Sequence, residues 1–133
     1  MTYLIAYVTV LLVFGAIDAT WLSTMGPMIY KPALGDILAP SLRVGPAIAF
    51  YAMYPVGVVV FAALPALRTQ TPIIGAALAA LFGALAYGTY DLTNYATLRN
   101  WNLQITLLDI VYGAFASGIA ATAAYYAVRT IAR

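Results

Sequence analysis

IIGAALAALFGALAYGTYDLTNY, residues 73–95, is an apolar segment in which Asp91 is the only charged side chain. A bilayer core about 30 Å thick is crossed by about 20 predominantly apolar residues, because a helix rises about 1.5 Å per residue. Three other segments have the same character, near residues 3–22, 44–64 and 103–128. The sequence therefore predicts four transmembrane helices.

The composition of the whole chain agrees with a membrane domain. Of its 133 residues, 65% are hydrophobic and 8% are charged, whereas about 25% of the residues in a soluble domain are charged. The links 65–72 and 96–102 are short, which favours antiparallel neighbours. We expect residues 23–43, which contain several prolines and glycines, to form a broken surface segment. The predicted fold is one all-α domain over residues 1–133, an integral membrane up-down four-helix bundle.

Several kinds of site are excluded by the residue types that the chain lacks. There is no Cys, His or Glu, which excludes disulfides, thiolate metal sites and histidine-ligated haem or zinc. We therefore predict no metal site, and the sequence identifies no cofactor. The net charge of +2 comes from scattered residues and does not indicate nucleic-acid binding.

Three aspartates lie inside the predicted spans: Asp18, Asp91 and Asp109. Each lies within a few residues of a predicted helix end, and the alternating topology brings all three ends to the same membrane face. An ionised carboxylate costs about 2.5–3.5 kcal/mol at the centre of a membrane helix, so a functional role is the default interpretation. The sequence predicts a polar site near one face of the membrane.

Helical spacing groups further polar residues with these acids. Tyr87, Asp91 and Asn94 share one stripe of the third predicted helix, and Thr106 and Asp109 share one stripe of the fourth. Deeper along the same two stripes the side chains become small, which allows membrane helices to approach closely. These small residues are Gly75, Ala79, Gly83, Gly113, Ser117 and Ala121. We expect a bundle that packs tightly at one end and opens into a polar pocket at the other.

The predicted ligand-binding residues combine these stripes with the acid of the first helix and a tyrosine of the second. They are Asp18, Tyr51, Tyr87, Asp91, Asn94, Thr106 and Asp109. At least one of the acids is expected to be protonated or paired with Arg99 or Arg43. Trp21, Tyr30 and Trp101 are interpreted as aromatic-belt residues at the same face.

The orientation of the bundle is left open by its basic residues. We name the face that carries the N-terminus side A and the opposite face side B. Side A carries Arg68, Arg129 and Arg133, and side B carries Lys31, Arg43 and Arg99. The positive-inside rule therefore gives a tie. We favour side A as cytoplasmic because side B holds the long link.

Three segments resemble a known family. They are YDLTNYATLRNW at residues 90–101, DATW at 18–21 and DIVYG at 109–113. They are similar to DUF2177, a family of small bacterial membrane proteins of unknown function, in which Trp is more frequent at the position of Tyr112. The resemblance covers nearly the whole chain. It implies a multi-pass, four-helix protein of the bacterial cytoplasmic (inner) membrane, and it implies no particular activity.

Four functions remain open. The first is binding of a small molecule or lipid headgroup in the polar pocket, with the lipid bilayer as the surroundings. The second is an accessory subunit of a larger membrane complex, or a homo-oligomer, packed through the small-residue faces. The third is a lipid-modifying membrane enzyme in which an Asp acts as base or metal ligand. The fourth is a proton-coupled carrier. We rank binding first.

Overall fold

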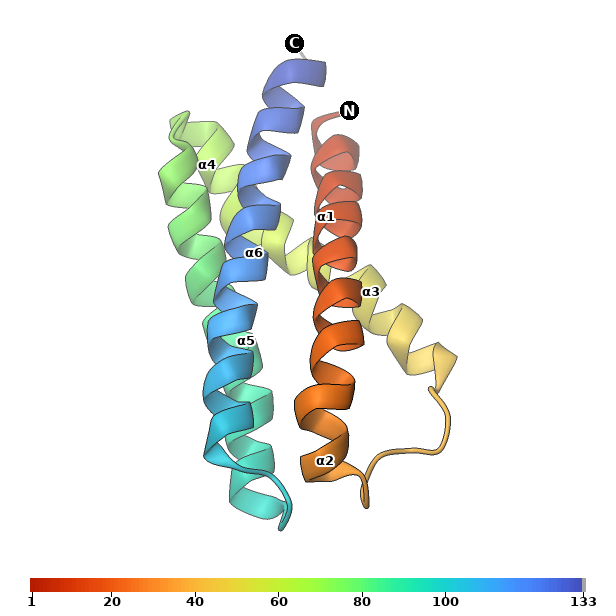
Figure 1. The fold of residues 1–133 in the computed structure, drawn as a ribbon. Helices are drawn as coiled ribbons and strands as arrows, with labels where there is room; N and C mark the ends of the chain where they lie inside the picture. The colour runs from red at the N-terminus through yellow and green to blue at the C-terminus, as the bar shows by residue number, and fades with distance from the viewer. Residues whose placement is uncertain (133) are drawn as a thin grey trace.

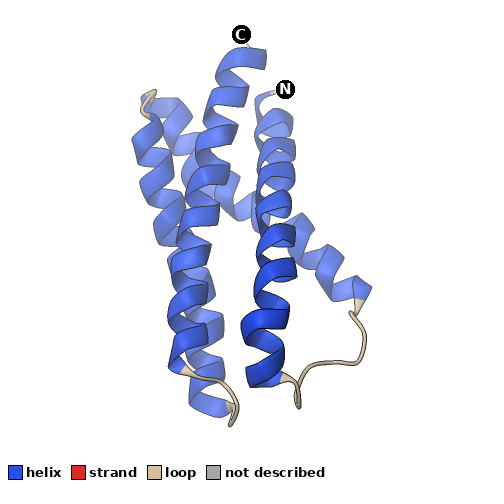
Figure 2. Ribbon diagram, in the orientation of Figure 1, coloured by secondary structure: helices blue, strands red, loops and turns tan. Residues whose placement is uncertain are grey.

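The computed structural model describes residues 1–132, which are helical apart from short links (Figure 2). Four continuous helices run over Thr2–Leu34, Val44–Thr69, Pro72–Thr97 and Leu103–Ile131, and each is long and apolar enough to cross a membrane. The prediction of an all-α fold with four spanning helices is confirmed. Arg133, counted above among the side A basic residues, lies outside the described residues.

Consecutive helices run in opposite directions, so both ends of the chain lie at side A (Figure 1). The fourth helix, α6 (Leu103–Ile131), packs against the third helix, α5 (Pro72–Thr97), and against α1 (Thr2–Met25) of the first helix. α6 also contributes the largest set of buried side chains, many of them Ala or Gly. It is therefore the central helix of the bundle.

The first helix is longer than the sequence indicates. α1 continues through a π-helical turn, η1 (Gly26–Tyr30), into α2 (Lys31–Leu34). The expectation that residues 23–43 form a broken surface segment is therefore wrong for residues 23–34, and only the link 35–43 remains. In η1 the amide of Lys31 donates to the carbonyl of Gly26, five residues earlier. The wider turn makes room for Pro32, whose ring would otherwise meet the carbonyl of Met28.

The second helix contains the same device. α3 (Val44–Val58) leads into a π-helical turn, η2 (Val59–Ala63), and then into α4 (Leu64–Thr69). The amide of Leu64 donates to the carbonyl of Val59, and Pro65 follows directly. Pro65 was expected to lie in a link, but the helix continues past it. In both helices a π turn accommodates a proline that would otherwise break a regular α-helix.

Glycine brings α5 and α6 together. A β-carbon on Gly83 would clash with the carbonyl oxygen of Gly113, and one on Gly113 would meet the ring of Tyr87 and lie 3.0 Å from the carbonyl oxygen of Gly83. The two backbones therefore touch where the stripes of small residues were predicted to pack. This contact sets the depth at which the polar ends of both helices face each other.

The second helix is held less closely. α3 packs mainly against α1 and leans away from the bundle toward the link 35–43 (Figure 1). The hydroxyl of Tyr7 donates to the carbonyl of Ala52 at 2.8 Å, and Phe14 packs against Phe50 and Tyr54. An aromatic layer in the middle of the bundle therefore joins α3 to the other helices. This layer lies nearer to side A than the acids do.

Candidate functional site

Asp18 of α1 is bonded to two tyrosines from two other helices. The hydroxyl of Tyr112 in α6 donates to Oδ1 of Asp18 at 2.6 Å, and the hydroxyl of Tyr51 in α3 donates to Oδ2. The carboxyl group of Asp18 is buried, with 6% of the residue exposed. Both of its oxygens therefore accept a hydrogen bond within the membrane, which offsets part of the cost of placing the acid there.

Asp109 of α6 is the centre of a second, adjoining set of contacts. The hydroxyl of Tyr30 in η1 donates to Oδ1 of Asp109, and Nε1 of Trp21 donates to the hydroxyl oxygen of Tyr30 at 2.9 Å. The indole of Trp21 stacks on the ring of Tyr112, with centroids 4.3 Å apart and 20° between the planes. Because Tyr112 also bonds to Asp18, the two sets form one network.

Asp91 of α5 differs from the other two acids. It is 0% exposed, and among residues 1–132 no donor reaches either of its carboxylate oxygens. Its carboxyl group lies near that of Asp109. In the part of the chain that the structure describes, Asp91 is therefore a buried acid with no hydrogen-bond donor and no ion pair.

The structure thus brings Asp18, Asp91 and Asp109 into one neighbourhood. We define the acid–tyrosine cluster as these three acids together with Tyr30, Tyr51 and Tyr112. A hydrogen-bond network of Asp and Tyr side chains at this end of the bundle is the part of the predicted site that the structure contains.

The remaining predicted site residues take different positions. Tyr87 is partly buried, and its ring meets those of Tyr54 and Tyr112 edge to face, so it lines the cluster. The hydroxyl of Thr106 donates to the carbonyl of Asn102 in its own helix at 2.9 Å. Asn94 is partly exposed. Thr106 and Asn94 share the predicted stripes, but their polar groups lie outside the network of hydrogen bonds.

Three residues of the network were missed or misassigned by sequence reasoning. Tyr30 was placed in a surface link, and Trp21 and Tyr30 were interpreted as belt residues, yet both bond within the cluster. Trp101 was also interpreted as a belt residue, but it is 8% exposed and packs with Leu34 and Ile105. Two signals for Tyr112 were available: its position one turn after Asp109 and its place in the family-like segment 109–113.

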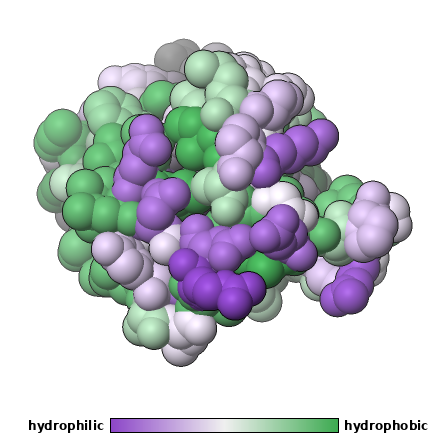
Figure 3. Space-filling view, turned by 60° about the horizontal axis from the view of Figure 1, so that its bottom comes forward, coloured by the Kyte–Doolittle hydropathy of each residue, from purple (hydrophilic) through white to green (hydrophobic). Residues whose placement is uncertain are grey.

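The charges around the cluster are distributed unevenly. Within residues 1–132, neither Arg43 nor Arg99 forms an ion pair with any of the three acids, and both arginines are exposed. Hydrophilic side chains gather on the side B end of the molecule (Figure 3). Among the exposed polar residues there are Lys31, Arg43 and Arg99. A buried acidic cluster therefore lies beneath an exposed basic surface.

Comparisons with known proteins identify a family, but they find no similar curated protein or solved structure. No curated protein and no solved structure matches the chain. A family model described as "Predicted membrane protein (DUF2177)" matches residues 3–126. The matched region includes every residue of the acid–tyrosine cluster, and it confirms the resemblance found in the three sequence segments. The chain belongs to the DUF2177 family of membrane proteins.

Proposed function

We propose that this protein binds a positively charged group, carried by a lipid headgroup or a small molecule, at the acid–tyrosine cluster. The observation that carries the proposal is Asp91, a fully buried carboxyl group near Asp109 that has no hydrogen-bond donor within residues 1–132. Buried polar groups in proteins are normally hydrogen-bonded, and a buried charge is normally paired. A bound cation would supply the partner that the described residues do not.

Energetics favour binding over a purely structural role. An acid in a membrane helix costs about 2.5–3.5 kcal/mol at the helix centre, whereas a hydrogen bond between membrane helices contributes about 0.6 kcal/mol on average. Tyrosines donate to Asp18 and Asp109, but no described residue donates to Asp91. Contacts between helices alone are therefore a weak reason for an acid at position 91.

We infer that the bound group is an organic cation. The rings of Trp21, Tyr112 and Tyr87 lie next to the acids, and aromatic faces attract ammonium groups. Within the described residues, no three acidic side chains are grouped closely enough to hold one metal ion. An ammonium group, which needs only carboxylates and aromatic faces, suits this cluster better than a divalent metal.

A lipid headgroup is a suitable carrier of that ammonium. Tyr51 of α3 and Tyr87 of α5 are partly exposed. α3 leans away from the bundle at its side B end (Figure 1). The basic residues exposed at side B suit the phosphate of a zwitterionic headgroup, while the acids beneath suit its ammonium. A small amine would contact only the acids. The two sources therefore differ in whether a phosphate also binds to the basic residues.

The test is lipid and amine retention in nanodiscs of phosphatidylglycerol, with either phosphatidylethanolamine or free ethanolamine added. Native mass spectrometry would show which molecule stays with the protein. We expect wild type to retain one of the two and Asp91→Asn to lose it. Asp36→Asn is the matched control, because Asp36 lies exposed in the link 35–43. Equal retention by Asp91→Asn and wild type, or retention of neither molecule by wild type, would overturn the proposal.

A further inference from the structure

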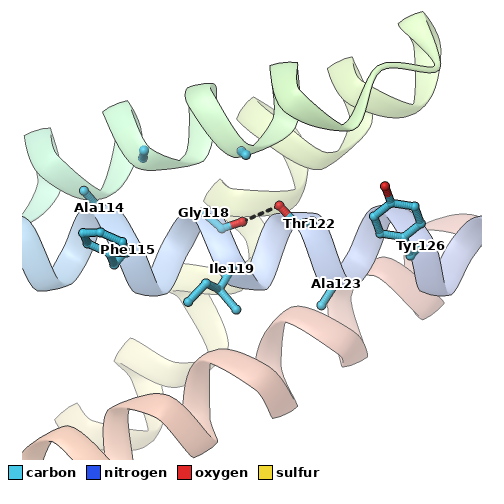
Figure 4. A pocket seen from close by; sticks show the side chains of 9 residues that line it. Ala114, Phe115, Gly118, Ile119, Thr122, Ala123 and Tyr126 are labelled. Atoms are coloured by element: carbon cyan, nitrogen blue, oxygen red, sulfur yellow. Dashed lines mark hydrogen bonds between the residues drawn. The ribbon is translucent and has the colours of Figure 1, made fainter.

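Buried polar side-chain atoms without a hydrogen-bond partner are confined to one end of the described bundle. Among residues 1–132 they occur in two residues, Asp91 and Trp101, which both lie at the side B end. The groove between α5 and α6 shows the contrast (Figure 4). It is lined mainly by apolar side chains, and the hydroxyl of Thr122 already donates to the carbonyl of Gly118 at 2.7 Å. The side B end is therefore where the chain leaves polar groups for a ligand.

Nε1 of Trp101 is a donor that the proposed function does not use. Trp101 lies in the link 98–102, shortly before α6 begins, and 8% of the residue is exposed. It is buried together with Leu34 of α2 and Ile105 of α6. Buried N–H groups are normally hydrogen-bonded, because an unpaired donor loses its bonds to water and gains nothing in return. This position therefore suits an acceptor atom that residues 1–132 do not supply.

Two contacts connect Trp101 to the acids. Tyr30 packs against the apolar cluster that contains Trp101, and its hydroxyl donates to Asp109. The ring of Tyr90, the residue next to Asp91, meets the indole edge to face, with centroids 5.7 Å apart and 89° between the planes. Trp101 therefore borders the same polar region as the two acids.

Trp101 lies nearer to side B than the acids do. Asp109 is about 9 Å from the start of α6 at about 1.5 Å per residue, whereas Trp101 precedes that start. Exposed bases belong to the same segments, because Arg99 is in the link with Trp101 and Lys31 is in α2 with Leu34. An acceptor at Trp101 thus lies between buried acids and exposed bases. An anionic oxygen suits this place better than a neutral one, because the bases attract it.

We propose that Nε1 of Trp101 donates to a phosphate oxygen of the ligand whose ammonium is held at the acid–tyrosine cluster. This inference rests on the proposed function and narrows it from amines in general to amines that carry a phosphate. The ammonium supplies donors to Asp91, and the phosphate supplies the acceptor for Trp101, so one zwitterion pairs both groups. A phosphate has several acceptor oxygens, and those that do not face the indole remain available to the exposed bases. A phospholipid headgroup and free phosphoethanolamine share this chemistry.

The first experiment compares two ligands that differ in the phosphate. Calorimetry would measure the dissociation constants of phosphoethanolamine and ethanolamine for the protein in maltoside micelles, which contain no phosphate. Wild type should bind phosphoethanolamine about tenfold more tightly, because a hydrogen bond to a charged acceptor contributes that much. Trp101→Phe keeps an aromatic ring and should remove this preference. Tyr90→Phe is the matched control, because it keeps the ring beside the indole and changes only the hydroxyl of an exposed residue.

A third sample distinguishes the two sources of the phosphate. Phosphatidylethanolamine added to the micelles should displace phosphoethanolamine if the natural ligand is a lipid, and it should not do so if the ligand is soluble. Either result supports a phosphate at Trp101, provided that Trp101→Phe weakens the binding of the preferred compound.

The second experiment observes the donor itself by NMR. The chain has two tryptophans, so isotope labelling gives two indole N–H resonances. Nε1 of Trp21 donates to Tyr30, which bonds to Asp109, so the Trp21 resonance should respond to both ligands. The Trp101 resonance should move downfield with phosphoethanolamine or phosphatidylethanolamine and stay in place with ethanolamine. This measurement uses wild-type protein, so it decides the result even if Trp101→Phe fails to fold.

The outcomes separate this inference from the proposed function. Equal affinity for phosphoethanolamine and ethanolamine, with a response of Trp21 alone, would overturn the inference and leave the ammonium site intact. A Trp101 resonance that moves in Tyr90→Leu but not with any ligand would also overturn it, because the donor would then face the Tyr90 ring. If neither amine nor the lipid binds, both proposals fail.

Discussion

At the scale of single residues, tyrosine does two things in this protein. Its hydroxyl donates to a carboxylate, and its ring packs in the apolar interior, so one side chain both compensates a buried acid and fills space. Tyr112 is the clearest case, because it bonds to Asp18 and stacks on Trp21. The acids are therefore held in the membrane by neighbours that are themselves largely apolar.

Replacing Tyr112 by Phe tests this role. Tyr112→Phe keeps the ring and removes the donor to Asp18. We expect a loss of about 1 kcal/mol in the free energy of unfolding in detergent micelles, above the average of about 0.6 kcal/mol for a bond between membrane helices because a buried acceptor is left unpaired. Tyr95→Phe is the control, because Tyr95 is exposed, and its effect should stay within about 0.5 kcal/mol. Equal stability of the two variants would show that the hydrogen bond to Asp18 contributes nothing.

At the scale of helices, two contacts determine where the polar residues meet. The glycine contact between α5 and α6 brings Asp91 beside Asp109, and the continuation of the first helix to Leu34 carries Tyr30 to Asp109. Loss of the glycine contact would separate Asp91 from Asp109, and an earlier end of the first helix would separate Tyr30 from Asp109.

The glycine contact predicts a difference between two Gly→Ala substitutions. Gly83→Ala would force α5 from α6, because the new methyl group clashes with the backbone of Gly113, and it should lower the free energy of unfolding by about 2 kcal/mol. Gly15→Ala meets no atom within 4 Å and should stabilise α1 by up to about 1 kcal/mol. Steric-trap or denaturant unfolding would measure both. A neutral Gly83→Ala would contradict the close approach.

The continued first helix predicts local protection from hydrogen exchange. Leu34 is 3% exposed and packs with Trp101 and Ile105. Leu34→Ala should lower the local stability of residues 26–34 by about 2 kcal/mol, which corresponds to roughly thirtyfold faster amide exchange. Leu38→Ala, at a residue 43% exposed, should leave exchange unchanged. Rapid exchange of these amides in wild type would contradict the helical continuation.

At the scale of the whole molecule, four antiparallel helices place the link 35–43 on one face and the short turn after Thr69 on the other (Figure 1). The chain has no cysteine, so an introduced thiol is the only one present. This makes the topology directly measurable in cells.

We propose that the protein lies in the bacterial cytoplasmic membrane with side A inside. In intact cells, a membrane-impermeant maleimide should label Asp36→Cys, and it should label Thr69→Cys only after permeabilisation. The reverse pattern would place side A outside. Labelling of both thiols in intact cells would contradict the antiparallel arrangement itself.

The four spans, the family and the three membrane acids were evident from the sequence. A membrane span is recognised from the hydropathy of about 20 consecutive residues, so it can be predicted without knowledge of the helices that pack against it. The stripes containing Asp91 and Asp109 were visible for a similar reason, since residues three and four apart share a helix face. The small residues Gly83 and Gly113 followed from the same spacing, and the structure packs them together.

Only the tertiary structure decided how far the first helix runs and which side chains bond to the acids. Gly26, Pro27 and Pro32 are local signals that normally end a helix, and a π turn together with packing against Trp101 and Ile105 overrides them. Tyr30 and Asp109 are 79 residues apart in the chain. Their contact depends on the rotation and depth of two separate helices, which no local pattern encodes.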